Sequence, residues 1–363
     1  MRICFIVGAF PPMKCGIGDY TYNLCRELKN LGMDIDVITS SNSESVNEDG
    51  FNIHNIINEW TFESKNIIIK KLQELKIEVV HIQYPSEEYG ESVFINLLPG
   101  IIKRKLGIKV VETVHEYLNY TYKGKLRNLI NYKSADSIFV VEKQYIDKIK
   151  SFIPIISKSI DIKYIPISSN IPISNMDEYE LQKLKENLGL KDEKVISYFG
   201  FINELKGFEI LLESVQEIKK SINNIRLLIL AELNKNNNYH QSIINKIEEY
   251  KMQDNIIITG FIDSSDKVAD YLRLSDLAIL PFKQGVSERN GSFLAAYNQG
   301  IPIITTCIED KKSEDGIYYV NPGESIKIVE EAKKILSVKQ VYRRQVLSWG
   351  KIAEIHAETY IRL

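Results

Sequence analysis

Short apolar segments alternate with amphipathic stretches along the whole chain. In the first half the apolar segments are continuous, which is typical of strands buried on both faces of a parallel sheet. We predict strands at residues 2–7, 34–39, 78–83, 109–115, 137–141 and 162–167, with helices such as 20–31, 92–105 and 123–133 between them. This order predicts an α/β domain with helices on both faces of the sheet.

A second series of the same kind follows residues 168–180, a segment rich in Ser, Asn and Pro that is typical of a linker. Its predicted strands are 194–200, 225–231, 255–259, 277–280 and 301–305. Residues 338–363 form one long helical pattern with apolar positions from Trp349 to Tyr360. We therefore predict an N-terminal domain (1–170), a C-terminal domain (171–340) and a final helix (341–363) that packs back on the first domain.

Composition supports a globular protein of two domains. The chain has 363 residues, of which 44% are hydrophobic and 26% charged, and its formal net charge of −2 gives no general attraction to nucleic acid. No apolar run approaches the roughly 18 residues of a membrane span, and no signal-peptide pattern leads the chain, so we expect a cytoplasmic protein. The four cysteines form no CxxC pair and the five histidines are scattered, so we predict no structural metal site.

The loops at the carboxyl ends of the strands are the candidate sites, because ligands of open parallel sheets bind there. The most informative loop follows the strand at 277–280 and carries Glu288 and Arg289. Asn290, Gly291 and Ser292 then open a helix, whose first amides have no partner within the helix and attract anions. We predict an anion site here, although many α/β proteins have a strand, a polar loop and a capped helix.

The loop after the first strand, residues 8–20, carries Gly16 and Gly18 just before a helix. Its backbone can therefore approach a phosphate or a sugar, although a plain turn remains an alternative. Asp19 is either a helix N-cap or a ligand group. A dinucleotide site is disfavoured, because Thr21 stands where the fingerprint needs its third glycine and the second strand ends without an acidic residue.

Two further loops follow the strands that end near residues 83 and 115. Gln83 makes one face of its strand end polar, and Tyr84 and Tyr89 suit a carbohydrate, since flat rings pack on sugar faces. His115 lies at a strand end, where a catalytic or binding role and a structural role are equally open.

Lys206 is predicted in the first turn of a helix, where its charge opposes the helix dipole. A phosphate partner would explain that position, and a solvated surface lysine is the alternative. Asp34 and Asp36 form a DxD pattern, whose two carboxylates could hold a divalent metal. Because they open a strand at its amino end, away from the predicted ligand edge, we predict no metal there.

In this order and spacing, eight segments resemble the retaining, nucleotide-sugar-dependent glycosyltransferases of the GT-B type, in the large family four (group 1). They are PPMKCGIGDY, HIQY, TVHE, YIPISSNIP, FGFINELKG, ITGFIDSSDKVADYLRLSDLAILPF, SERNGSFLAAYNQGIPIITT and WGKIAEIH. The resemblance covers essentially the whole chain. It implies two doubly wound Rossmann-like domains that face each other across a cleft. It also implies metal-independent transfer of a sugar from a UDP- or GDP-linked donor to a hydroxyl acceptor, with retention, in bacterial glycan or glycoconjugate assembly.

The resemblance also assigns roles to residues. Lys206 and the helix start at 290–292 would neutralise the leaving diphosphate, with Gly16 and Gly18 near it, while His115 would contact the transferred sugar. The residues expected to be catalytic are His115, Asp19 and Glu288. Those expected at the acceptor or sugar cleft are Gln83, Tyr84, Tyr89 and Glu116. No cofactor is implied beyond the nucleotide-sugar co-substrate.

Two positions depart from the family pattern. Phe201 stands where the family usually has an arginine, and Ala295 stands where it usually has a second glutamate. We hypothesise that Arg289 supplies the missing cation, because it lies next to the predicted helix start at residues 290–292. The departures leave open a catalytically weakened partner or scaffold protein of the same fold. A nucleotide-sugar epimerase is a third interpretation, but it needs more acid–base groups in the cleft.

The sequence leaves the acceptor open, since a carbohydrate, a lipid-linked or a protein hydroxyl fits the resemblance. A basic cluster in the first domain would suit anionic lipid at the inner face of a membrane, but a solvated helix end explains it as well or better. The cluster consists of Lys103, Arg104, Lys105 and Lys109. Peripheral membrane association is therefore left open, and no nucleic-acid partner is expected.

Overall fold

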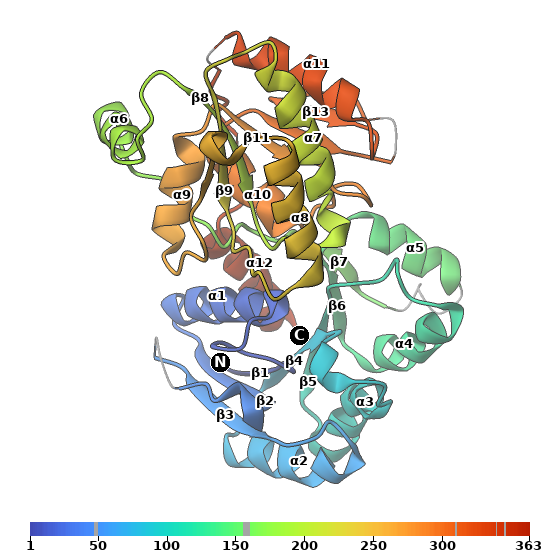
Figure 1. Ribbon diagram of the computed structural model, residues 1–363. Helices are drawn as coiled ribbons and strands as arrows, with labels where there is room; N and C mark the ends of the chain where they lie inside the picture. Colours follow the sequence, from blue (N-terminus) through green and yellow to red (C-terminus); the bar gives the residue numbers. More distant parts are fainter. Residues whose placement is uncertain (47–49, 155–159, 309–310, 339, 345) are drawn as a thin grey trace. The chain divides into compact units, whose positions relative to one another are not determined.

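The computed structural model describes residues 1–46, 50–154, 160–308, 311–338, 340–344 and 346–363. The chain divides into two compact units. The first comprises Met1–Ser168 with Leu347–Leu363, and the second comprises Ser169–Val346. In each unit a parallel sheet is flanked by helices (Figure 1). Among the described residues, no helix combines the length and the apolarity needed to cross a bilayer.

The first unit contains a seven-stranded sheet in the order β3-β2-β1-β4-β5-β6-β7, in which every pair is parallel. The chain order reverses between β1 and β4, which is the switch point where ligands bind in such sheets. The strands are β1 (Arg2–Ile6), β2 (Asp34–Ser40), β3 (Asn52–Ile57), β4 (Val79–Tyr84), β5 (Lys109–Val114), β6 (Ser137–Val140) and β7 (Ile162–Tyr164). The helices are α1 (Gly16–Asn30), α2 (Lys65–Glu74), α3 (Phe94–Leu106), α4 (Tyr122–Ser134), α5 (Gln144–Phe152) and α12 (Trp349–Arg362).

The final helix, α12, packs beside α1 on one face of the first sheet (Figure 1). Its apolar side chains, Trp349, Ile352 and Tyr360, join the same buried cluster as Leu24 of α1. The helix is shorter than predicted, because it begins at Trp349 and Ser348 caps it by accepting a hydrogen bond from the amide of Lys351.

The residues before α12, predicted to be helical, belong to the second unit and instead bond to other segments of it, Tyr342 through its backbone and Arg344 through its side chain. The amide of Tyr342 donates to the carbonyl of Gly300 at 2.7 Å, and the Nε of Arg344 donates to the carbonyl of Asp315 at 2.9 Å. Backbone groups that bond to neighbouring segments are unavailable to a helix, so the prediction of one helix over 338–363 was wrong in its first part.

The second unit contains a six-stranded parallel sheet in the order β10-β9-β8-β11-β12-β13, with its switch point between β8 and β11. The strands are β8 (Lys194–Phe199), β9 (Ile225–Leu230), β10 (Ile256–Ile258), β11 (Leu277–Leu280), β12 (Ile303–Thr306) and β13 (Ile317–Val320). The helices are α6 (Glu178–Asn187), α7 (Phe208–Lys219), α8 (Asn238–Glu249), α9 (Ser265–Arg273), α10 (Gly291–Asn298) and α11 (Ser325–Leu336).

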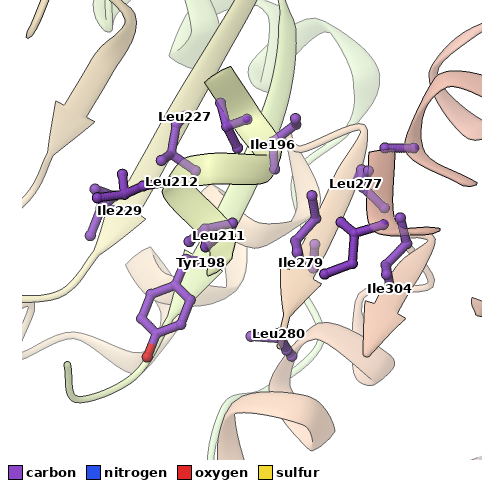
Figure 2. Packing of buried hydrophobic residues seen from close by; sticks show 14 of the residues in the cluster. Ile196, Tyr198, Leu211, Leu212, Leu227, Ile229, Leu277, Ile279, Leu280 and Ile304 are labelled. Atoms are coloured by element: carbon purple, nitrogen blue, oxygen red, sulfur yellow. The ribbon is translucent and has the colours of Figure 1, made fainter. Parts of the chain in front are cut away.

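The core of the second unit explains why its strands read as continuous apolar runs. Figure 2 shows Leu211 and Leu212 of α7 directed at side chains of the sheet, among them Ile196 of β8, Leu227 of β9 and Ile279 of β11, and all are fully buried. The opposite face carries its own cluster against α9, so the central strands bury residues on both sides. The prediction of two doubly wound Rossmann-like domains is confirmed.

Two strands escaped the sequence prediction, and both lie at sheet edges. β3 has the sequence NIHNII, in which polar residues interrupt the apolar run, and four of its six residues are half-buried. β13, with the sequence IYYV, is only four residues long. Because an edge strand is covered on fewer sides, its sequence need not be continuously apolar, and this weakens the signal.

A carboxyl group is buried in the first unit, on the face of β5 that packs against α4. Glu112 is fully buried, and its Oε1 accepts a hydrogen bond from Asn131 Nδ2 at 3.1 Å. Burial raises the pKa of Glu112 to about 8, although the bond from Asn131 opposes the rise. Glu112 Oε2 and Asn131 Oδ1 have no partner among the described residues. A charged carboxylate would leave Oε2 buried without a donor, so this environment favours the neutral acid.

We predict that Glu112→Gln changes how the stability of the first unit depends on pH. A carboxyl whose pKa rises from 4.5 in the unfolded chain to about 8 in the folded one stabilises the fold below pH 4.5 and loses that contribution as the pH rises to 8. The variant should therefore gain about 4 kcal/mol relative to the wild type between pH 5 and pH 8.5. Urea unfolding followed by tryptophan fluorescence measures this, because both tryptophans, Trp60 and Trp349, belong to the first unit.

The control is Glu63→Gln, which removes an exposed carboxyl from the same unit. Its stability difference from the wild type should stay constant over this pH range. Equal pH profiles for the wild type and Glu112→Gln would contradict the assignment of a neutral buried acid.

Candidate functional site

In the second unit, the loops that follow β8 and β11 lie directly against each other. A Cβ atom at Gly200 would collide with the hydroxyl of Ser292, and one at Gly207 would collide with the carbonyl oxygen of Pro281. Gly207 also has a φ of +65°, a conformation that side chains other than glycine rarely adopt. The two glycines therefore allow the carboxyl ends of β8 and β11 to form one continuous surface.

Lys206 lies on this surface. The prediction that it lies in the first turn of a helix was wrong. Lys206 ends the 3₁₀ turn Glu204–Lys206, and Gly207 then caps α7. Its Nζ atom lies 4.8 Å from the centre of the Phe282 ring, and burial lowers the pKa of the ammonium group. Among the described residues, no carboxylate forms an ion pair with it. A partly desolvated cation over an aromatic face would be stabilised by an anion.

The start of α10 provides backbone donors at the same edge of the sheet. Asn290 is the N-cap, as predicted, and its side-chain oxygen accepts from the amide of Phe293 at 3.3 Å. Within the described part of the chain, no group accepts a hydrogen bond from the amides of Gly291 or Ser292. The first turn of α10 holds no acidic residue. This arrangement favours binding of an anion at the helix start.

The loop between β11 and α10 carries the two charged candidates. Glu288 is exposed and Arg289 is half-buried, and they immediately precede the N-cap of α10. Ala295, where a glutamate was noted as missing, is fully buried in the cluster that contains Leu272 of α9. A carboxylate at that position would enter an apolar core, so the packing here excludes a glutamate.

Two residues that shape this surface were not foreseen from the sequence. The Phe282 ring lies under Lys206, and His240 Nε2 donates to the carbonyl of Ile202 at 2.8 Å, while His240 Nδ1 accepts from the amide of Asn234. These bonds hold the loop in which the Phe201 side chain is 68% exposed. His240 lies at the start of α8, and no sequence signal links it to a loop 38 residues earlier.

In the first unit, polar side chains of β4 and β5 bond across the strands. His81 Nε2 lies 2.7 Å from Thr113 Oγ1, and Gln83 Oε1 lies 2.7 Å from His115 Nε2. The edge of the Tyr20 ring packs on His115, with the ring centres 4.7 Å apart. These groups share one face of the sheet, so His115 is held at the carboxyl end of β5 by two neighbours.

The glycine-rich loop of the first unit is closely packed as well. A Cβ atom at Gly18 would lie 2.8 Å from the carbonyl oxygen of Ala9, so this glycine is required, whereas Gly16, the first residue of α1, has open space around it. Asp19 is not a helix N-cap, because Cys15 occupies that position. It lies in the first turn of α1, half-buried, and burial raises its pKa.

Tyr84 and Tyr89 do not form the sugar-facing surface that the sequence suggested. Each side chain is 3% exposed, and both belong to the apolar cluster of β4 and α3. The hydroxyl of Tyr89 donates to the carbonyls of Ile6 and Gln83. Glu116 binds within its own loop, where Oε1 accepts from the amides of Tyr117 and Asn119. These three side chains therefore stabilise the loops.

The acidic side chains that the structure describes in the first unit do not cluster into a metal site. Asp36 is buried, and its oxygens bind Arg2 Nε at 3.0 Å and His54 Nε2 at 2.9 Å. Burial alone would raise the pKa of Asp36, but the bonds from His54 and Arg2 lower it below its usual value. Over the residues that the structure describes, no group of three or more His, Cys, Asp or Glu side chains could hold a metal ion.

The basic cluster of the first domain is partly neutralised. Asp136 lies 3.0 Å from Lys103 Nζ and 3.7 Å from Lys109 Nζ. Two of the four cations of this cluster therefore have a carboxylate partner.

Two family models together match most of the chain. The model described as Glycosyltransferase Family 4 matches residues 15–164, and the model described as Glycosyl transferases group 1 matches residues 193–337. The second match contains Lys206 and the start of α10. No curated protein matches the chain.

Solved structures with the same fold span nearly the whole chain. A glycosyltransferase from Rickettsia africae is 16% identical, with a TM-score of 0.73 over 99% of this chain and 93% of that one. HepE from Anabaena, in complex with UDP, is 12% identical, with a TM-score of 0.74 over 99% and 95%. UDP-GlcNAc 2-epimerase from Methanocaldococcus jannaschii is 13% identical, with a TM-score of 0.65 over 100% of both chains. At these identities the likeness shows the fold alone.

We predict that Gly207→Ala destabilises the second unit more than Gly189→Ala does. Both glycines have a positive φ, but a Cβ at Gly189 meets no atom within 4 Å, whereas one at Gly207 meets the backbone of Pro281. Gly189→Ala should cost about 1 kcal/mol from backbone strain, and Gly207→Ala about 1–3 kcal/mol more from the collision.

Calorimetric unfolding of the two variants, with hydrogen exchange over residues 194–219 and 277–298, measures the difference. Equal costs for the two variants, without faster exchange in these segments, would show that the loops are not in close contact.

Proposed function

Because the chain belongs to glycosyltransferase family 4, the group 1 glycosyltransferases, we propose that it transfers a sugar from a nucleotide-diphosphate sugar to a hydroxyl acceptor with retention of the anomeric configuration. The observation that carries the proposal is the pairing of the Lys206 ammonium with the start of α10 at one edge of the second sheet. A leaving nucleoside diphosphate is an anion that such a surface stabilises.

The proposed chemistry follows from the negative charge that develops when the bond between the donor sugar and its diphosphate breaks. As the bond between the anomeric carbon and the phosphate oxygen breaks, negative charge grows on the diphosphate. The amides of Gly291 and Ser292 and the ammonium of Lys206 would stabilise that charge and so lower the barrier. Fixed protein dipoles and a side-chain cation do this work, so we propose that no metal ion is required.

In the proposed reaction, the acceptor hydroxyl forms its bond to the anomeric carbon on the face that the diphosphate leaves. The hydroxyl proton passes to the departing phosphate oxygen, so the donor itself acts as the base. We assign contact with the transferred sugar to His115 and place Asp19, whose pKa is raised by burial, near the glycine loop as an auxiliary acid–base group. We retain Glu288 as a donor-site residue.

For the donor nucleotide we propose UDP, with GDP as the comparison. HepE, which has the same fold, was solved with UDP, and this supports the choice at the level of the fold. The proposed acceptor, carbohydrate, lipid-linked or protein, is a hydroxyl compound of bacterial glycan or glycoconjugate assembly. Asp136 offsets one of the four positive charges of the basic cluster, which weakens any contact of that cluster with anionic lipid.

A partner or scaffold protein without transfer activity is the second candidate. It is favoured by Phe201, an exposed aromatic side chain where the family usually has arginine, and by the buried Ala295. It predicts that neither UDP nor GDP binds. The epimerase shares the fold, but both matched family models describe glycosyltransferases.

We predict that Lys206→Met weakens UDP binding by about 10- to 100-fold, the loss expected when a charge-assisted hydrogen bond is removed. Methionine keeps the apolar stem over Phe282 and removes only the charge. Lys219→Met, at the other end of α7, is the control and should bind like the wild type. Calorimetric titration with UDP and GDP measures this. If the wild type binds neither nucleotide, the scaffold interpretation replaces the transferase.

We also predict that Arg289→Ala lowers UDP affinity several-fold and makes binding less sensitive to salt, because Arg289 would supply the cation that Phe201 lacks. Lys283→Ala is the matched control, since Lys283 belongs to the same loop but its Nζ lies 3.5 Å from Glu209. An unchanged dissociation constant in Arg289→Ala would refute the compensation. Turnover of a panel of UDP- and GDP-sugars then identifies the donor.

A further inference from the structure

We propose that Gln299 is a positioning residue of the candidate anion site, because it anchors the end of α10 to a segment that joins the two units. Arg344 forms the matching anchor to the second joining segment. The anion site lies at the start of the same helix, so the two anchors hold the amides of Gly291 and Ser292 in place. The inference rests on the proposed function in one respect, namely that the diphosphate binds at the start of α10.

The chain passes between the two units twice, after Ser168 and again before Leu347. The first joining segment, residues 169–176, opens the second unit, and the second joining segment, residues 340–344, lies near the end of that unit. Both segments bond to the carboxyl end of α10. One helix end in the second unit therefore binds both connections.

Gln299, the C-cap of α10, uses both ends of its amide on the first joining segment. Its Oε1 accepts from the amide of Ser174 at 3.0 Å, and its Nε2 donates to the carbonyl of Pro172 at 2.7 Å. One partner is a donor and the other an acceptor, so together they fix the orientation of the amide. Gln299 is 3% exposed, and Asn298 adds a bond from its Nδ2 to the carbonyl of Ile171 at 3.0 Å.

The second joining segment binds the same helix end. The amide of Tyr342 donates to the carbonyl of Gly300 at 2.7 Å, and Arg344 Nη1 donates to the carbonyl of Tyr297 at 3.2 Å. The guanidinium also lies 4.6 Å from the centre of the Tyr297 ring. A Cβ at Gly300 would collide with the carbonyl oxygen of Tyr342, so this approach requires glycine. A cation at the carboxyl end of a helix complements the dipole whose other end attracts anions.

α10 depends on its ends more than a longer helix would. It has eight residues, and helices of this length are not stable by themselves in water. Its buried side chains, Ser292, Ala295 and Ala296, are small, so their burial contributes less than that of large apolar side chains. The hydrogen bonds at the two ends of α10 therefore carry a larger share of its stability.

The alternative is that the anchors act locally and leave the first turn of α10 unaffected. Two amides of that turn distinguish the two possibilities. The amide of Phe293 donates to Asn290 Oδ1, and that of Leu294 donates to the carbonyl of Asn290. Within the described part of the chain neither amide bonds to Gln299, so Gln299 can protect them only through the helix.

The experiment is amide hydrogen exchange, followed by NMR, in the nucleotide-free full-length protein. Gln299→Met keeps the length and removes both bonds, so exchange at Phe293 and Leu294 should become about 5- to 30-fold faster. Gln241→Met is the matched control, because Gln241 bonds to Asn245 on an exposed face of α8, and it should leave these amides unchanged. Unchanged exchange at both amides in Gln299→Met would overturn the proposal.

A second pair of variants tests the other anchor, whether or not Gln299→Met folds. Arg344→Met should also speed exchange at Phe293 and Leu294. Arg344→Lys keeps a donor and a cation at the helix end, so it should restore part of the protection. A rise of equal size throughout the sheet of the second unit would indicate general destabilisation and would contradict a positioning role.

UDP supplies the second readout. A ligand that binds only the ordered helix start slows exchange, by one common factor, at every amide that opens together with it. The amides of Ser174 and Tyr342, which bond to the end of α10, should therefore slow with that of Leu294 in the wild type. Protection of Leu294 alone would overturn this inference and leave the proposed function standing. If UDP does not bind, the proposed function fails, and exchange in nucleotide-free Gln299→Met still decides this inference.

Discussion

The close contact of backbone with backbone at Gly207 and Pro281 is the constraint on which the candidate site depends. No side chain separates the loop after β8 from the loop after β11, so Lys206 and the first turn of α10 are parts of one surface. That contact also sets the direction of the chain into α7, because Gly207 caps the helix in a left-handed conformation. The lysine that precedes this cap places its ammonium group 4.8 Å from the centre of the Phe282 ring, in the loop after β11.

Around β4 and β5, the core of the first unit contains buried titratable groups whose pKa shifts favour their neutral forms. Burial lowers the pKa of His81, with smaller contributions from His356 and His115, and burial also lowers the pKa of His356 to about 4. Glu112 on the other face of the sheet is shifted in the opposite sense by the same cause. The sheet thus holds neutral imidazoles on one side and a neutral acid on the other. Near the carboxyl end of β5, the side-chain contacts of Thr113 and His115 are hydrogen bonds to β4.

Periodicity was sufficient to predict the fold, because the central strands are buried on both faces and the helices between them are amphipathic. It failed where burial is one-sided, at β3 and β13, and where backbone bonds to another segment prevent a helix, as at Tyr342. The start of α10 was predictable because Asn290 caps it locally. Phe282 under Lys206, and His240 at the Ile202 carbonyl, were not predictable, since these contacts join residues far apart in sequence. The buried rings of Tyr84 and Tyr89 show that a residue type suited to sugar does not reveal which way its ring points.

The return of α12 to the first unit determines the order in which the molecule can be completed during synthesis. The second unit is one continuous stretch of chain. The hydrophobic core of the first unit stays incomplete until the ribosome has added Trp349, Ile352 and Tyr360 of α12. Until then His81 also lacks the Tyr360 hydroxyl beneath it. A polypeptide released before these residues are made would expose apolar surface on the face of α1, which chaperones and proteases recognise. The unit that begins first along the chain is therefore the one that finishes last.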